Sequence, residues 1–242
     1  MRRQLTSAGG RGFVLGLSGG VDSAVVARLA QLAAPGHVVA AILPTHSDPR
    51  DEQDAELIAK HFSLPTVRVD LSGAYDAAID ALLPAVQDLP AVTRPVSNDA
   101  AEVRRPLANI KPRLRMTALY FLANRLDYLV AGTGNRAELS IGYFTKHGDG
   151  GCDLLPIGRL VKSEVRALAR ALNVPASIID RTPTAGLWLG QTDEEEMGFT
   201  YTDLERYLEE GPQGVPPALA MKIERLIRSS EHKCALPPMP DD

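Results

Sequence analysis

The chain has 242 residues, enough for one domain with a sizeable buried core. Its composition, 45% hydrophobic and 23% charged, is typical of a globular protein, and a net charge of −4 argues against strong sequence-independent binding of nucleic acid. No apolar run approaches the roughly 18 residues that span a membrane, and the N-terminus lacks the apolar stretch of a signal peptide. The cysteines, Cys152 and Cys234, have no metal-ligand spacing. These features predict a cytoplasmic protein that binds neither a membrane nor nucleic acid.

The first third of the chain alternates short apolar runs with segments of helical periodicity. We expect strands at 12–17, 38–43 and 66–70, and helices at 23–34, 51–62 and 73–83. Buried strands that alternate with helices form parallel sheets covered on both faces. The predicted fold class is therefore α/β, a Rossmann-like open parallel sheet with helices on both faces.

The pattern breaks at residues 84–108, which carry four prolines and form either a lid or a passive loop. Beyond them the sequence predicts a helix, a strand and three further helices, at 110–125, 128–131, 162–172, 201–210 and 216–232. Two segments rich in glycine and polar residues, 132–156 and 182–198, are typical of sites rather than scaffold. We expect one domain, 1–242, with mobile loops at 84–108 and 182–198.

A glycine-rich turn joins the first strand to the first helix. Adjacent glycines and the amides at a helix start bind phosphate, but the lysine of GxxxxGK[ST] is absent and GxGxxG does not match. Asp22 would repel phosphates unless a cation lies between them, which predicts Mg²⁺. The alternative is a turn in which Asp22 and Ser23 only cap a helix. The candidate phosphate-binding residues, which the resemblance described next assigns to ATP, are Gly16, Leu17, Ser18, Gly19, Gly20, Val21, Asp22 and Ser23.

The run Ser-Gly-Gly-Val-Asp-Ser at 18–23 resembles the pyrophosphate loop of ATP pyrophosphatases. The second half narrows that resemblance, because several motifs are similar to those of the NAD synthetase family and together they cover about 13–238. The motifs are NIKPRLRM at 109–116, GTGNRAE at 132–138, GYFTKHGDGGCD at 142–153, LVK at 160–162, PTAGLW at 183–188, QTDE at 191–194 and the pair His232-Lys233.

The charged residues of these motifs have a physical interpretation of their own. Glu138 follows a predicted strand and turn, so it would lie at the sheet edge of Asp22 and share its Mg²⁺. Lys162 begins a helix, where a cation is unfavourable unless it neutralises a phosphate. Arg113, with Arg115, begins another helix and predicts an anionic ligand for the same reason. Glu138 could instead be a solvated helix residue, which is the favoured interpretation without the resemblance. Arg113 and Arg115 could be surface arginines whose stems cover apolar neighbours.

The resemblance implies the rest of the site and the reaction. It implies an adenine nucleotide alpha hydrolase-like fold, a homodimer, and ATP with Mg²⁺. ATP would adenylate the carboxylate of nicotinic acid adenine dinucleotide (deamido-NAD), and ammonia would then displace AMP to give NAD. Asp149, near the reaction centre, could take a proton from ammonium. The positions that match the family are Thr133, Lys162 and Thr184 for ATP, Asp22 and Glu138 for Mg²⁺, and Arg113, Lys146, Asp153, His232 and Lys233 for deamido-NAD.

Other interpretations remain open at this point. Lys146 and Asp149 could belong to a charged surface loop, and Leu187 and Trp188 could be core anchors or part of a lid. The rival functions are another adenylating amidotransferase, such as a GMP synthetase core, and a nucleotide sensor without turnover. The N-terminus is also shorter than in many NAD synthetases, which begin with a longer helix before the first strand.

Overall fold

A single parallel sheet organises the chain in the computed structural model, which describes residues 1–87, 101–188 and 190–239. The strand order is β3–β2–β1–β4, with β1 (Gly12–Gly16), β2 (Val38–Ile42), β3 (Thr66–Arg68) and β4 (Tyr128–Val130). The chain first builds outward from β1 to β3 and then returns to the other side of β1 with β4. Such a switch point opens a crevice at the carboxyl ends of the strands.

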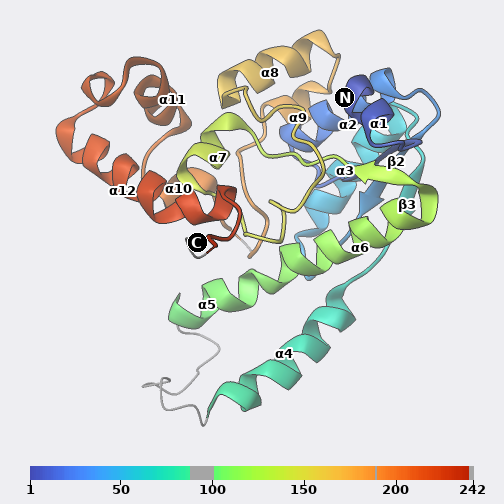
Figure 1. The fold of residues 1–242 in the computed structure, drawn as a ribbon, viewed down its shortest axis with the longest axis horizontal. Coiled ribbons are helices and arrows are strands. Elements are labelled where there is room, and N and C mark those ends of the chain that lie inside the picture. The colour runs from blue at the N-terminus through green and yellow to red at the C-terminus, as the bar shows by residue number, and fades with distance from the viewer. Residues whose placement is uncertain (88–100, 189, 240–242) are drawn as a thin grey trace.

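Helices surround the sheet and extend beyond it (Figure 1). Their bounds are α1 (Arg2–Ser7), α2 (Val21–Ala33), α3 (Pro49–His61), α4 (Ser72–Gln87), α5 (Ala101–Ala108), α6 (Ile110–Leu126), α7 (Arg136–Ile141), α8 (Lys162–Ala171), α9 (Ala176–Ile179), α10 (Asp193–Met197), α11 (Tyr201–Glu210) and α12 (Pro217–Cys234), with a 3-10 turn at Pro212–Gly214. None of the described helices is long and apolar enough to cross a bilayer.

The alternation of side chains along β1 divides the core between the two faces of the sheet. Phe13 and Leu15 pack with α2, α3 and α8 in the largest cluster of buried residues. Val14 points the other way and packs with Val130 and Ala123 of α6. Because both faces are covered, the strands are apolar throughout rather than alternating with polar residues. The predicted fold class is confirmed.

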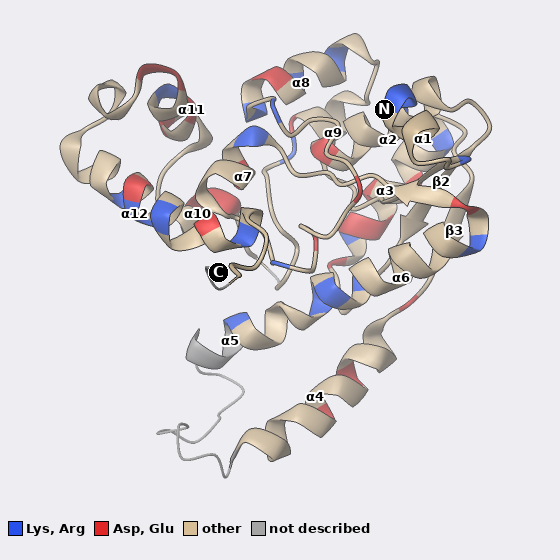
Figure 2. Ribbon diagram, viewed as in Figure 1, with Lys and Arg blue, Asp and Glu red and all other residues tan. Residues whose placement is uncertain are grey.

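A second buried cluster lies away from the sheet. It joins α7 to α10, α11 and α12 through Ile141, Met197, Tyr201, Leu204 and Ile223. Figure 1 shows these C-terminal helices on the far side of α7 from the sheet. Figure 2 shows acidic and basic residues interspersed over α8, α11 and α12. This cluster positions the polar segment that precedes α10.

The four predicted strands are confirmed, and the predicted helices begin and end within a few residues of the observed ones. The main correction concerns 84–108, whose described ends are helical: α4 continues through Pro84 to Gln87, and α5 spans Ala101–Ala108 with Pro106 inside it. A proline inside a helix removes one amide donor and crowds the preceding turn. The neighbouring residues favour helix strongly enough that the helix continues on both sides of each proline. Residues 88–100 lie outside the described residues. Sequence reasoning also missed the short helices α1, α7, α9 and α10.

Candidate functional site

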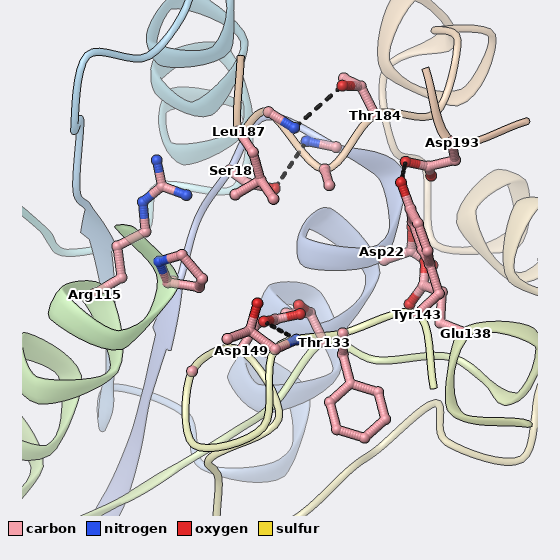
Figure 3. Close-up of a pocket in the computed structure, with 18 of the residues that line it drawn as sticks. Ser18, Asp22, Arg115, Thr133, Glu138, Tyr143, Asp149, Thr184, Leu187 and Asp193 are labelled. Carbon is pink, nitrogen blue, oxygen red and sulfur yellow. Dashed lines mark hydrogen bonds between the residues drawn. The ribbon is translucent and has the colours of Figure 1, made fainter. Parts of the chain in front are cut away.

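A cavity of about 800 Å³ opens at the carboxyl ends of β1, β2 and β4. Figure 3 shows Ser18, Thr184 and Leu187 along one wall and Asp149 with Thr133 across the cavity. Asp22, Glu138, Tyr143 and Asp193 gather on a third side. The structure thus brings the glycine-rich turn into one site with segments far away in sequence.

The turn before α2 is held open by its own hydroxyls. The Ser23 hydroxyl, which is buried, donates to the Gly20 carbonyl at 2.9 Å, and the Ser18 hydroxyl donates to Ser23 Oγ at 3.1 Å. Gly20 is the N-cap of α2 and provides no side-chain cap, so the amides at the helix start remain available to a ligand. Asp22 makes no side-chain hydrogen bond that caps the helix, so the alternative in which Asp22 serves only as a helix cap does not hold.

Gly19 lies against α3 rather than in the cavity lining. Its φ is +83°, and a Cβ there would lie 2.5 Å from the Asp51 carbonyl oxygen. Only glycine combines this left-handed backbone with so close an approach. The remaining residues of the turn, from Gly16 to Ser23, line the cavity.

Lys162 lies between two carboxylates of the cavity wall. Its ammonium donates to Asp22 Oδ2 and lies 3.8 Å from Glu138 Oε1. The other oxygen of each carboxylate is held by Asn135: its Nδ2 donates to Asp22 Oδ1 at 3.1 Å, and its backbone N–H donates to Glu138 Oε2 at 3.1 Å. Asn135, itself fully buried, therefore leaves one oxygen of each carboxylate facing the cation.

Burial dominates the electrostatics of this cluster. It raises the pKa of Glu138 to about 8, and the nearby charge of Asp22 adds to that effect while Lys162 opposes it. Burial alone would lower the pKa of Lys162, but Asp22 and Glu138 outweigh it and the net direction is upward. Lys162 therefore stays charged and neutralises this wall.

The same donor set fits a divalent cation. Asp22 Oδ2 and Glu138 Oε1 both face the positive charge of the Lys162 ammonium, so these two carboxylates are the residues that would hold a divalent cation. Among the described residues no group of three or more His, Cys, Asp or Glu is arranged to hold a metal. Mg²⁺ commonly takes one or two carboxylates and completes its shell with phosphate oxygens and water.

The opposite wall carries an acidic and a basic side chain, Asp149 and Arg115. The Asp149 carboxylate accepts the Thr145 amide at 2.8 Å, and burial raises its pKa although that bond and the charges of Lys233 and Arg115 oppose the shift. Arg115 donates to the Leu43 carbonyl at 3.1 Å and to Ser47 Oγ at 3.0 Å. Burial lowers the pKa of Arg115. Its place in the lining makes it a further candidate for an anionic ligand.

The basic residues predicted for the second substrate line the cavity together. Lys146 donates to the His232 carbonyl, and Lys233 Nζ donates to the Gly142 and Phe144 carbonyls at 2.6 and 2.8 Å. Arg113 reaches the Lys146 carbonyl at 3.4 Å. Burial lowers the pKa of Lys233, which Asp149 partly offsets. These contacts bring the end of α12 onto the 142–151 turn.

Asp153 is the predicted substrate residue that the structure places elsewhere. It lies outside the cavity lining and accepts the Val130 amide at 2.7 Å and the Tyr120 hydroxyl at 3.0 Å. Both bonds fasten the 142–153 segment to β4 and α6. Thr133 and Thr184 line the cavity as predicted, and the Thr184 hydroxyl accepts the Gly186 amide at 3.1 Å.

Sequence reasoning assigned no role to several polar residues of this region. Asp193, Tyr143 and Asn135 lay inside the quoted motifs, but nothing in their spacing predicted mutual contact. Arg181 is a further case: it bonds Asp51 and lies 2.7 Å from Asp54 Oδ2, which ties the start of the 182–198 segment to α3. The signal that could have indicated a role for these residues was the occurrence of acidic residues and tyrosines in short loop segments.

Comparison with known proteins gives a consistent result. The family model described as NAD synthase matches residues 1–237. A curated NH(3)-dependent NAD(+) synthetase of Carboxydothermus hydrogenoformans is 49% identical, covering 99% of this chain and 93% of the relative. The solved NMN synthetase of Francisella tularensis has a TM-score of 0.87 at 35% identity, covering 100% of this chain and 94% of that one. The NAD+ synthetase of Burkholderia pseudomallei has a TM-score of 0.76 at 36% identity, covering 98% and 86%.

Proposed function

Because this chain belongs to the NAD synthase family, we propose that it amidates deamido-NAD to NAD with ATP and ammonia, releasing AMP and pyrophosphate. The observation that carries the proposal is the convergence of the glycine-rich turn, Lys162 and Asp149 on one cavity. As a ligase that forms a C–N bond, the enzyme must turn a poor electrophile, a carboxylate, into a good one before an amine can attack it.

The turn would bind the β- and γ-phosphates of ATP, with Lys162, Thr133 and Thr184 around the triphosphate. Asp22 and Glu138 would hold Mg²⁺, which supplies positive charge to the phosphates when bound. Lys162 already balances those carboxylates, so it can transfer its hydrogen bonds to a phosphate oxygen. Charge neutralisation and positioning then favour attack of the nicotinate carboxylate on the α-phosphorus.

On the other wall, Arg113, Lys146, His232 and Lys233 would hold deamido-NAD so that its carboxylate faces the α-phosphate. Asp149 lies at the same wall. Its raised pKa makes it a stronger base than a carboxylate of ordinary pKa, suited to taking a proton from ammonium before the amine attacks the adenylate. Asp153 would contribute to substrate binding indirectly, because its hydrogen bonds hold in place the segment that carries Asp149.

Product analysis tests the proposal directly. The full chain is incubated with ATP, Mg²⁺, ammonium and deamido-NAD, and the products are separated. We expect NAD, AMP and pyrophosphate in equal amounts. Formation of ADP and phosphate would contradict the proposal, and no turnover would contradict it in favour of a nucleotide sensor. A parallel incubation with a xanthine nucleotide in place of deamido-NAD tests the GMP synthetase-like alternative, which turnover there alone would favour.

One observation favours a second substrate, nicotinic acid mononucleotide: the backbone of the chain is similar to that of the NMN synthetase of Francisella tularensis. Nicotinamide mononucleotide is also an amide of a nicotinate carboxylate, so the same two steps would form it. We expect deamido-NAD to be preferred, and the ratio of kcat/KM for deamido-NAD and nicotinic acid mononucleotide measures this. A ratio below one would reassign the substrate.

We propose that the chain forms one catalytic domain and acts in the cytoplasm as a homodimer. Exposed apolar side chains on α4 and α6, Leu82 and Phe121, are compatible with a second copy. Light scattering on the purified chain measures the assembly, and a monomeric mass would contradict the dimer.

A further inference from the structure

Asp193 is a buried carboxylate that the proposed reaction does not use. It begins α10, is only 4% exposed and accepts hydrogen bonds from two phenols. The Tyr201 hydroxyl donates to its Oδ2 at 2.8 Å, and the Tyr143 hydroxyl shares its single hydrogen between Asp193 Oδ1 at 3.2 Å and Glu196 Oε2 at 2.9 Å. Burying a charge costs free energy unless such partners compensate it, so its presence here calls for a reason.

One side of Asp193 leads to the segment that covers the cavity. Tyr143 lies 2.9 Å from Glu196 Oε2, and the Gln191 amide donates to that same oxygen at 2.7 Å. Gln191 Oε1 in turn accepts the Leu187 amide at 2.8 Å. The backbone of Leu187, which lines the cavity, is therefore connected to Asp193 through side-chain hydrogen bonds.

A second bond holds the same point of the segment. Lys111, from the first turn of α6, donates to the Leu187 carbonyl at 2.8 Å. Leu187 is thus held on its amide by Gln191 and on its carbonyl by Lys111. The segment is fastened at this residue above the glycine-rich turn (Figure 3).

On its other side, Asp193 is connected through Tyr201 to the cavity wall that carries Glu138 and Lys162. The Tyr201 hydroxyl lies 3.4 Å from Glu138 Oε1, the oxygen that faces Lys162. The Lys162 ammonium also lies 5.1 Å from the centre of the Tyr201 ring. Tyr201 thus contacts both Asp193 and the pair that would neutralise the phosphates.

We propose that Tyr143 and Tyr201 are positioning residues that couple the 182–188 segment to the Asp22–Glu138–Lys162 cluster through Asp193. The inference rests on the proposed use of that cluster for Mg²⁺ and ATP. When the described part of the segment is fastened, Asp193 is held where Tyr201 can orient Glu138. A nucleotide with Mg²⁺ that draws on Glu138 and Lys162 then stabilises the fastened segment in return, because the coupling between two sites is reciprocal.

The test removes single hydroxyls and keeps the rings. Tyr143→Phe and Tyr201→Phe each break one connection, while Tyr207→Phe removes a phenol from the same C-terminal cluster, outside the cavity lining. Binding of α,β-methylene-ATP with Mg²⁺ is measured by calorimetry, without turnover. Hydrogen exchange of amides in 182–188 is followed with and without the analogue. Circular dichroism and thermal melts check that each variant is folded.

We expect the two network variants to bind the analogue with Mg²⁺ about 10- to 100-fold more weakly, as is usual when a residue behind a metal ligand is lost. The analogue should also protect the 182–188 amides in the wild type and the Tyr207→Phe control, but much less in Tyr143→Phe and Tyr201→Phe. In steady state, the KM for ATP should rise more than the KM for deamido-NAD.

Two results would overturn the coupling. One is unchanged analogue affinity in both network variants, and the other is weaker affinity with protection of 182–188 as in the wild type. These binding results are independent of the product analysis. A wild-type protein that fails to make NAD would therefore refute the proposed reaction without deciding the coupling.

Discussion

Lys162 is almost completely buried at the first position of a helix, a place unfavourable to a cation in isolation. The carboxylates of Asp22 and Glu138 face its ammonium, and they offset both the cost of burying the charge and the unfavourable helix dipole. The sequence predicted that Lys162 would have an anionic partner, because its helical position required one. It did not predict that protein carboxylates would provide that partner in the absence of phosphate.

Asp149 gives a prediction for the reaction. Asp149→Asn keeps an oxygen that can accept the Thr145 amide, but it removes the proposed proton acceptor. We expect amidation of the adenylate to slow by about 10²-fold or more, the usual contribution of a general base, with adenylation much less affected. Rapid-quench measurement of pyrophosphate and NAD release separates the steps. Equal loss of both half-reactions would mean that Asp149 positions substrate instead.

The same residue gives a prediction for stability. Burial raises the pKa of Asp149 above its ordinary value of 3.8, so the folded protein binds that proton more tightly than the unfolded chain. Its contribution to stability is present below the unfolded pKa and is lost as the pH rises through the folded value. Asp149→Asn lacks this loss, so its melting temperature relative to the wild type should increase as the pH rises above 3.8, the ordinary pKa of the carboxyl. A difference in melting temperature that stays constant as the pH rises would contradict the raised pKa.

At the scale of elements, periodicity predicted the strands because buried strands of a parallel sheet are apolar on both faces. It also predicted the long helices, whose apolar stripes pack on the sheet. The short helices were missed because α7 and α10 owe their start to caps, Asn135 and Thr192, and their place to the second cluster rather than to an apolar stripe. Contacts between distant segments, such as that of Tyr201 with Glu138, depend on this tertiary arrangement and have no local signature.

The junction of α7 with α12 can be tested at Gly142. Its φ is +65°, and a Cβ there would lie 2.1 Å from Ser230 Cβ, whereas Gly36, with φ +76°, has no atom within 4 Å of an added Cβ. Gly36→Ala should cost about 1–2 kcal/mol for the left-handed backbone alone. Gly142→Ala should cost about 1–3 kcal/mol more, because α12 must move. Urea unfolding measures both; equal costs would show that α12 yields easily.

At the scale of the molecule, the site lies between two separately packed regions, the sheet with its helices and the cluster of α7, α10, α11 and α12. Residues that line the cavity come from both. The glycine-rich turn belongs to the first, while His232 and Lys233 reach the cavity from the end of α12. The second region can therefore open locally without unfolding the sheet.

Leu204 tests this independence. It is fully buried in the second cluster, as Ile58 is in the first. Leu204→Ala should cost about 2–5 kcal/mol and speed hydrogen exchange in α11 and α12, while the amides of β1 stay protected. Ile58→Ala should have a similar cost but expose the sheet as well. Uniformly faster exchange in Leu204→Ala would mean that the two regions unfold as one.

The hydrogen bonds of Asn135 have a consequence for the size of ion the site accepts. Each carboxylate has one oxygen that accepts a hydrogen bond from Asn135, which leaves the other oxygen as the better ligand and disfavours chelation of a cation through both. Larger Ca²⁺ gathers six to eight oxygens and often takes both from one carboxylate, whereas Mg²⁺ holds an octahedral shell rich in water. We therefore expect Ca²⁺ to replace Mg²⁺ poorly in calorimetric binding of the ATP analogue. Asn135→Ser, which keeps a helix cap but frees Asp22, should narrow that preference.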